Sequence, residues 1–217
     1  MAVAILVAVF IGFAPTYYFR GRFHDAPLPV LVQAHGAVFT AWVLLFCGQA
    51  LLVGAGRVSL HRRLGLLGAA LAPLVVLLGL ATALLSVRRD LAAGHGGALS
   101  FLALPIGDMA LFGGLAAAGL LLRRRPEAHK RLMLLATVAL LSAAFARWPA
   151  ALRLGGPLAF GGIDVFLVAN LVHDLVVRKR VHPVSLWGGL IVAAVERLRL
   201  LVSHTTLWLE LARWIAR

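Results

Sequence analysis

Seven long blocks of apolar residues, separated by short connections, constrain the fold of this chain most strongly. They are rich in Leu, Ala and Val and cover residues 2–19, 28–54, 64–86, 99–122, 131–150, 157–177 and 183–202. A bilayer core about 30 Å thick is spanned by roughly 20 apolar helical residues. Continuous apolarity, without alternation at every second residue, excludes a transmembrane β-barrel. The blocks therefore predict an all-α, polytopic transmembrane helical bundle of about seven spans.

The charged residues lie mainly between these blocks. Only 13% of the residues are charged, against about a quarter in soluble proteins, and the net charge is +13. In a soluble protein such a charge would indicate nucleic-acid binding. Here it is better explained by membrane topology, because Lys and Arg concentrate in cytoplasmic connections. We therefore expect the lipid bilayer, and no nucleic acid, as a partner.

Alternate connections differ in their content of Lys and Arg. Connections 55–63, 123–131 and 178–182 carry three, five and three of these residues. The intervening connections 20–27, 87–98 and 151–156 carry two, two and one. The positive-inside rule places the first set in the cytoplasm. This predicts an integral membrane protein with a cytoplasmic N-terminus and an outer C-terminus.

The three basic connections share an Arg four residues before a His. The pairs are Arg57 and His61, Arg125 and His129, and Arg178 and His182. A match at a fixed phase indicates duplication of one helical hairpin. We therefore interpret residues 1–217 as a single transmembrane domain of one leading helix, three parallel hairpins and an amphipathic interfacial helix. Their ranges are 1–19, then 28–86, 99–150 and 157–202, and finally 205–216.

Histidines near the basic connections are candidate cofactor ligands. They are His61, His129, His173 and His182. Neutral imidazoles that meet at one depth can ligate haem iron or another metal. We take haem b as the candidate cofactor, with Arg62, Arg63 and Arg131 as partners for its propionates. In the alternative interpretation, these Arg and His residues only anchor lipid phosphates.

A second candidate site lies in the outer half of the bilayer. The ionisable residues His35, Asp108, Arg147 and Asp164 interrupt the apolar blocks at similar depths, about 10–14 Å from the outer side for the first, second and fourth. Such groups are costly inside a membrane and mark functional sites. Heptad spacing places His35, Trp42 and Gln49 on one inward face. The set predicts either a polar cavity or a packed network.

Several of these residues form a signature that resembles uncharacterised bacterial multi-span membrane protein families. The signature comprises His35, Trp42, Gln49 and the run Leu60-His61-Arg62-Arg63-Leu64-Gly65, followed by Ala128-His129-Lys130-Arg131 and Val181-His182-Pro183. The spacing of the histidines is loosely similar to that in small haem-handling or oxidase-assembly membrane proteins. That resemblance implies haem as a cofactor and a redox or assembly partner in the membrane.

Three classes of function remain open. The first is a haem-b-binding redox or haem-handling protein that uses the histidines near the basic turns. The second is a small transporter, channel or sensor that uses the outer polar layer, and the third is a structural or assembly factor. No P-loop, zinc-protease helix or nucleophile elbow is present in the sequence. No catalytic residue is therefore assigned, and the sequence leaves open whether the protein is an enzyme.

Overall fold

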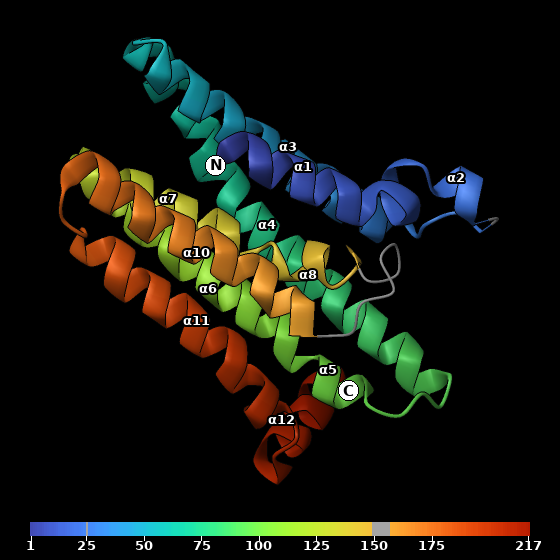
Figure 1. The fold of residues 1–217 in the computed structure, drawn as a ribbon. Coiled ribbons are helices and arrows are strands. Elements are labelled where there is room, and N and C mark those ends of the chain that lie inside the picture. The colour runs from blue at the N-terminus through green and yellow to red at the C-terminus, as the bar shows by residue number, and fades with distance from the viewer. Residues whose placement is uncertain (25, 149–156) are drawn as a thin grey trace.

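The regular structure of the described residues is helical throughout. The structure is a computed structural model and describes residues 1–24, 26–148 and 157–217, with only the backbone at 157–160 (Figure 1). Helices account for 85% of it, without strands in the described ranges, which confirms the all-α prediction. The elements are α1 (Ala2–Phe13), the π-helix η1 (Ala14–Tyr18), α2 (Arg20–Phe23), α3 (Val30–Gly54), α4 (Val58–Ala92), α5 (Ala98–Phe101), α6 (Ala103–Leu121), α7 (Pro126–Ala139), α8 (Ser142–Phe145), α10 (Pro157–Arg178), α11 (Pro183–Ser203) and α12 (Thr206–Ala216).

Four stretches of the described helices are long and apolar enough to cross a membrane. They are Val30–Gly54, Val58–Ala92, Ala98–Leu121 and Pro126–Phe145. Residues Ala2–Tyr18 form a shorter apolar helix. The long helices α10 and α11 each contain several ionisable residues. Length and composition thus make this chain an integral membrane protein, whereas the count of seven spans stays a prediction.

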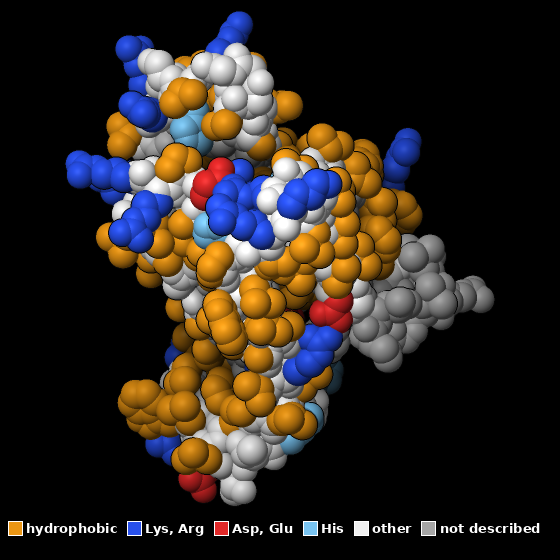
Figure 2. Space-filling model, turned by 60° about the vertical axis from the view of Figure 1, so that its left-hand side comes forward, with side chains coloured by type: hydrophobic (Ala, Val, Ile, Leu, Met, Phe, Trp, Pro, Cys, Tyr) orange, Lys and Arg blue, Asp and Glu red, His pale blue; other side chains and the backbone are white. Residues whose placement is uncertain are grey.

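The basic connections between helices come together at one end of the bundle. The turns that join α3 to α4, α6 to α7 and α10 to α11 lie on the left in Figure 1. Contacts join them, because His61 faces His129 and Arg178 forms an ion pair with Glu127. The space-filling view shows blue Lys and Arg side chains gathered around pale-blue His side chains (Figure 2).

The core is built around α6, which packs against α4, α7 and α11. At its centre the ring of Phe112 packs edge-on against Trp42, with ring centroids 4.8 Å apart. The indole of Trp42 donates to the Thr137 hydroxyl at 3.3 Å. Large apolar side chains also cover the outside of the helices, for example Val30 and Leu121 at 82% and 79% exposed. Such a surface suits a lipid environment.

Several predicted spans have different ends or shapes in the structure, among them the third and the fifth. The third apolar block, 64–86, lies within the 35-residue helix α4, which begins before it and ends after it. The fifth, 131–150, is not one continuous helix, because α7 ends at Ala139 and α8 begins at Ser142. This break turns the Ser142 hydroxyl toward the Asp108 carboxylate on α6. Residues 149 and 150 lie outside the described ranges.

The C-terminal helix α12 folds back against the middle of the chain. Thr205 starts it as a separate helix, because its hydroxyl accepts a hydrogen bond from the Trp208 backbone N–H. The Trp208 indole donates to the Leu99 carbonyl at 3.0 Å, and Arg88 donates to the Ala216 carbonyl at 3.0 Å. The segment predicted as an interfacial helix therefore packs on α4 and α5.

Candidate functional site

Two histidines, His61 on α4 and His129 on α7, face each other at the basic end. Their ring centroids are 6.2 Å apart and their planes are inclined by 79°. Nδ1 of His129 lies 2.8 Å from the carbonyl oxygen of Gly119 on α6. When Nδ1 carries the proton and donates to that carbonyl, Nε2 keeps its lone pair and the ring orientation is fixed. The arrangement suits His129 for metal ligation.

Two buried polar atoms at this place have no hydrogen-bonding partner in the described part of the chain. They are Nδ1 of His61 and Oε1 of Gln49. Gln49 lies on α3 and directs its side-chain amide toward Gly65, one turn after His61 on α4. Buried polar groups are nearly always hydrogen-bonded. The two atoms therefore leave hydrogen-bonding capacity unused here, beside a His61 ring that also lies close to the Gln49 backbone.

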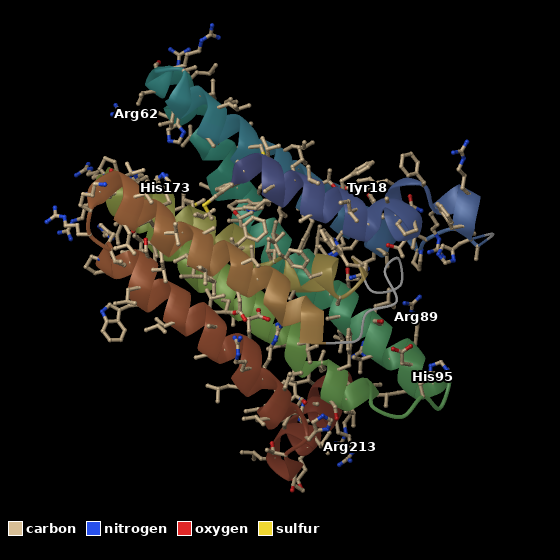
Figure 3. All side chains as sticks on the ribbon, viewed as in Figure 1. Tyr18, Arg62, Arg89, His95, His173 and Arg213 are labelled. Carbon is tan, nitrogen blue, oxygen red and sulfur yellow. The ribbon has the colours of Figure 1, made fainter. Side chains whose placement is uncertain are left out.

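The other two candidate histidines lie apart from this pair. His182 starts α11, where its Nδ1 accepts from the Val184 backbone N–H at 3.1 Å. Burial and the nearby Arg131 guanidinium lower the pKa of His182 below its ordinary value of 6.5. The side chain of His173 is exposed on α10 (Figure 3). The structure thus brings together His61 and His129 and leaves the other two candidates outside the pair.

The three candidate arginines differ in their surroundings. Arg62 and Arg63 are exposed on the first turns of α4, and Figure 3 shows Arg62 near the end of the α3–α4 hairpin. Arg131, in contrast, is only 2% exposed and is occupied by protein partners. Arg62 and Arg63 are free to bind an anionic group, whereas Arg131 has a structural partner.

That partner is Asp174, which lies at the centre of a buried hydrogen-bond network. Arg131 donates to both carboxylate oxygens of Asp174, with Nε 3.1 Å from Oδ2. Ser185 on α11 donates to the same Oδ2 at 2.6 Å, and the backbone N–H of His182 does so at 3.1 Å. Arg131 also donates to Glu127 Oε2 at 2.7 Å. This network joins α7, α10 and α11.

Asp108 lies in a second buried network in the other half of the bundle. Ser142 donates to its two carboxylate oxygens at 2.9 and 2.8 Å. Arg199 on α11 forms ion pairs with both Asp108 and Glu196 and donates to the Leu104 carbonyl at 2.9 Å. Asp108, Glu196 and Arg199 are 8%, 1% and 6% exposed. The sequence interpretation singled out Asp108, and its partners on α11 come from the structure.

The four residues of the predicted polar layer do not meet as one group. Asp108 belongs to the network above, while Asp164 pairs with Arg197 at 2.5 Å on the outside of the bundle. Arg147 donates to the Ala143 carbonyl and lies over the Phe13 ring. His35 packs on Phe39, with ring centroids 4.1 Å apart. Local partners therefore separate Asp108 from Asp164, whereas Arg147 lies near His35.

Grooves on the surface do not join these sites. An apolar groove of 340 Å³ between α10 and α11 is bordered by Asp164, Leu167 and Leu186. Another, of 460 Å³, follows the α3–α4 hairpin past Leu51 and Arg57. Within the described residues, no cluster of three or more His, Cys, Asp or Glu side chains could hold a metal ion. Among the described residues, the candidate histidines therefore supply at most two metal ligands together, His61 and His129.

Comparisons with known proteins identify no relative of this chain. No family model, no curated protein and no solved structure matches it. The structure defines the class, an all-helical integral membrane protein with a paired-histidine site and two buried ionic networks.

Proposed function

We propose that this chain is a bacterial inner-membrane protein that binds haem b between His61 and His129. The observation that carries the proposal is the opposition of two imidazole rings from different helices, at one end of the bundle, 6.2 Å apart. Haem iron has two axial positions that histidine nitrogens can fill. The pair supplies one nitrogen from α4 and one from α7.

The separation of the rings agrees with ligation of a common iron. A bond of about 2.0 Å from metal to imidazole nitrogen, and about 1.1 Å from that nitrogen to the ring centre, give about 6.2 Å between two axial rings. Each ring can rotate about its own metal–nitrogen bond, so an inclination of 79° is compatible with this geometry. The contact of His129 Nδ1 with Gly119 supports Nε2 as its ligand atom.

The number of ligands favours haem over a bare metal ion. A structural zinc site needs four protein ligands and a catalytic zinc site needs three. The described residues offer no group of three or more suitable side chains. A porphyrin brings four nitrogens of its own, so two histidines are sufficient. The unpartnered Nδ1 of His61 and Oε1 of Gln49 provide additional polar contacts beside it.

Charge at this end suits a dianionic cofactor. Arg62 and Arg63 follow His61 directly and are exposed, so their guanidinium groups are available for propionates. Lipid phosphates could use the same two residues. Arg131 is excluded from this role because Asp174 and Glu127 already occupy it. Bound haem would supply reversible one-electron chemistry or serve as cargo for a partner in the membrane, and the protein's contribution would be to hold and orient it.

The proposal includes a topology of seven spans. In it, one leading helix precedes three parallel hairpins, with the basic turns and the N-terminus in the cytoplasm and the C-terminus outside. The clustering of the three basic turns at one end supports this topology. The position of the N-terminus also supports it, because the Ala2 carbonyl accepts a hydrogen bond from Cys47, near the basic end of α3.

The transporter and structural alternatives have weaker support. A transport cavity formed by His35, Asp108, Arg147 and Asp164 requires these side chains to line one space, and each has its own local partners. A structural role describes the Arg131–Asp174 network well. It leaves the unpartnered atoms beside His61 without an explanation.

Absorption spectroscopy of the purified full-length protein tests the haem proposal. Protein produced with ample haem supply, or titrated with haem, should show a Soret band in stoichiometric amount. His61→Ala and His129→Ala should each change the ligation state, and the double variant should lose the band. His173→Ala is the matched control, because this exposed histidine lies outside the pair. A protein that remains colourless after titration, or a double variant that retains the wild-type spectrum, overturns the proposal.

A further inference from the structure

A second site lies where α6, α8 and α11 meet, about 20 Å from the basic turns. Asp108 precedes the end of α6 at Leu121 by 13 residues, and Glu196 follows the start of α11 at Pro183 by 13 residues. At 1.5 Å per residue, both carboxyl groups are about 20 Å along their helices. They therefore lie beyond the middle of an apolar layer about 30 Å thick.

The site contains two carboxyl groups and one cation. Arg199 forms ion pairs with both Asp108 and Glu196, and among the described residues it is the only cation bonded to either acid. All three residues are buried, and the side chains of Glu196 and Arg199 are only 1% and 5% exposed. With both acids ionised the cluster would have a net charge of −1. A buried charge without a partner is strongly unfavourable, and such a group takes up a proton instead.

The placement of the two acids gives a second argument. One guanidinium, that of Arg199, binds Asp108 through Nη1 and Glu196 through Nη2, so the two carboxyl groups are neighbours. Two carboxylates that share a site repel each other, and one group of such a pair keeps its proton.

The remaining contacts indicate which acid carries the proton. Asp108 receives hydrogen bonds from the Ser142 hydroxyl and from the Arg199 guanidinium, which stabilise its ionised form. Oε1 of Glu196 is buried and has no partner among the described residues. An unsolvated oxygen without a donor is suited to a neutral carboxylic acid.

We infer that Asp108 and Glu196 together bind one proton at neutral pH, carried by Glu196, so that the bundle has a proton-binding site inside the membrane. The ligand of the site is the proton itself, and its occupancy depends on Arg199. Loss of Arg199 from the site would strengthen proton binding, because no cation would then counter either carboxylate. This inference does not depend on the haem proposal.

Charged groups on the other neighbouring elements do not neutralise the second carboxylate. Arg197 on α11 is paired with Asp164 of α10, and Arg131 of α7 is paired with Asp174 near the basic end. The short helix α5 carries no ionisable residue, and those of α12, Glu210 and Arg213, are exposed. Arg199 thus remains the cation that counters both acids.

Gly107 and Leu104 explain how Arg199 is held between the acids. A Cβ on Gly107 would lie 3.0 Å from Cδ of Arg199, so the absence of a side chain there lets the arginine pass close to α6. The Leu104 carbonyl accepts a further hydrogen bond from the guanidinium at 2.9 Å. The cation therefore has a fixed position relative to both carboxyl groups.

Infrared spectroscopy of the full-length protein at pH 7, in a detergent without ester groups, tests the inference. A protonated carboxylic acid has a C=O stretching band that is separate from those of amides and carboxylates and shifts in D2O. The wild type should show this band with the intensity of one group. Glu196→Gln should remove it, and Asp108→Asn should also remove it, because Glu196 then ionises against Arg199 alone.

Asp164→Asn is the matched control and should leave the band unchanged, because Asp164 is half-exposed and paired with Arg197. Wild-type protein without the band overturns the inference, as does a band that survives either Glu196→Gln or Asp108→Asn in protein that remains monodisperse and helical. The wild-type measurement decides the question even if a variant fails to fold. A positive result is independent of the haem content of the protein.

Discussion

Arg131 and Asp174 form a two-point ion pair between α7 and α10 whose side chains are 3% and 0% exposed. Ser185 of α11 hydrogen-bonds to both partners, so three helices meet at a single pair of charges. Inside an apolar bundle each charge depends on the other, because no water is at hand to replace it. The pair therefore fixes how α7 packs against α10 and α11 at the basic end.

Replacement of Asp174 should show this dependence. Asp174→Asn leaves the Arg131 guanidinium buried without its counter-charge, and we expect a loss of about 3–5 kcal/mol in the free energy of unfolding. Denaturation in mixed micelles, followed by circular dichroism, measures the change. Asp164→Asn removes an exposed pair and should cost about 0–1 kcal/mol. Equal losses in the two variants would contradict the structural role of Asp174.

Close packing of α1 on α8 makes Gly12 sensitive to substitution. A Cβ at this position would lie 2.6 Å from the Ala144 carbonyl oxygen, a backbone atom that cannot move away alone. Gly12→Ala should therefore destabilise the protein by about 1–3 kcal/mol. Gly48→Ala is the control, because a Cβ there meets nothing within 4 Å and alanine favours the helix. A melting temperature that is lower for Gly48→Ala than for Gly12→Ala would contradict this prediction.

The cap of α11 should make stability depend on pH. His182 Nδ1 accepts the Val184 N–H only when that nitrogen is unprotonated, and burial with the nearby Arg131 lowers the pKa of His182 in the folded state. In the unfolded chain a histidine has a pKa of about 6.5, so below that pH the unfolded state binds the proton more readily than the folded state. The stabilisation from the cap is therefore fully present above pH 6.5 and is lost as the pH falls from there toward the lower pKa of the folded state.

His182→Asn isolates this contribution, because asparagine also caps a helix and does not titrate. The melting temperature of the wild type should fall more steeply than that of His182→Asn between neutral pH and pH 5. Other histidines affect both proteins alike, so the difference between the curves is the quantity to compare. Parallel curves would show that the cap does not titrate in this range.

Cysteine labelling in whole cells tests the orientation. The chain has one cysteine, Cys47, so a Cys47→Ser background allows single cysteines elsewhere. Arg124→Cys, in a basic turn, should react with a membrane-impermeant maleimide only after the cells are lysed. Gly96→Cys, in the connection between α4 and α5, should react in intact cells. The reverse pattern would place the basic turns outside.

The sequence was sufficient for features that depend on composition along the chain. Continuous apolar blocks predicted helices, and the boundaries of α3 and α11 agree closely with blocks 28–54 and 183–202. Heptad spacing predicted that Trp42 faces inward, and it is buried. The Lys and Arg counts predicted that the three basic connections lie on one side of the membrane, and they lie at one end of the bundle. Each of these depends on local order along one helix.

Features that depend on which helices are neighbours could not be predicted in this way. Depth along separate helices placed Asp108 and Asp164 together, but the rotation of α10 directs Asp164 to the outside. Arg199 and Glu196 were not predicted as site residues, because Asp108, the partner of the arginine, lies 91 residues away along the chain. Arg131 was predicted to bind an anion together with Arg62 and Arg63. The structure instead pairs it with Asp174 on another helix, which the sequence does not show.

The return of α12 onto α4 and α5 has a consequence for how the protein is made. Ala212 and Ala216 complete a small apolar cluster with Ala83, Val87 and Ala98, residues that leave the ribosome long before them. That cluster stays incomplete until α12, an 11-residue helix, has been synthesised and has docked. A bundle made without α12 would therefore expose the apolar side chains of this cluster, and quality-control proteases recognise such surfaces.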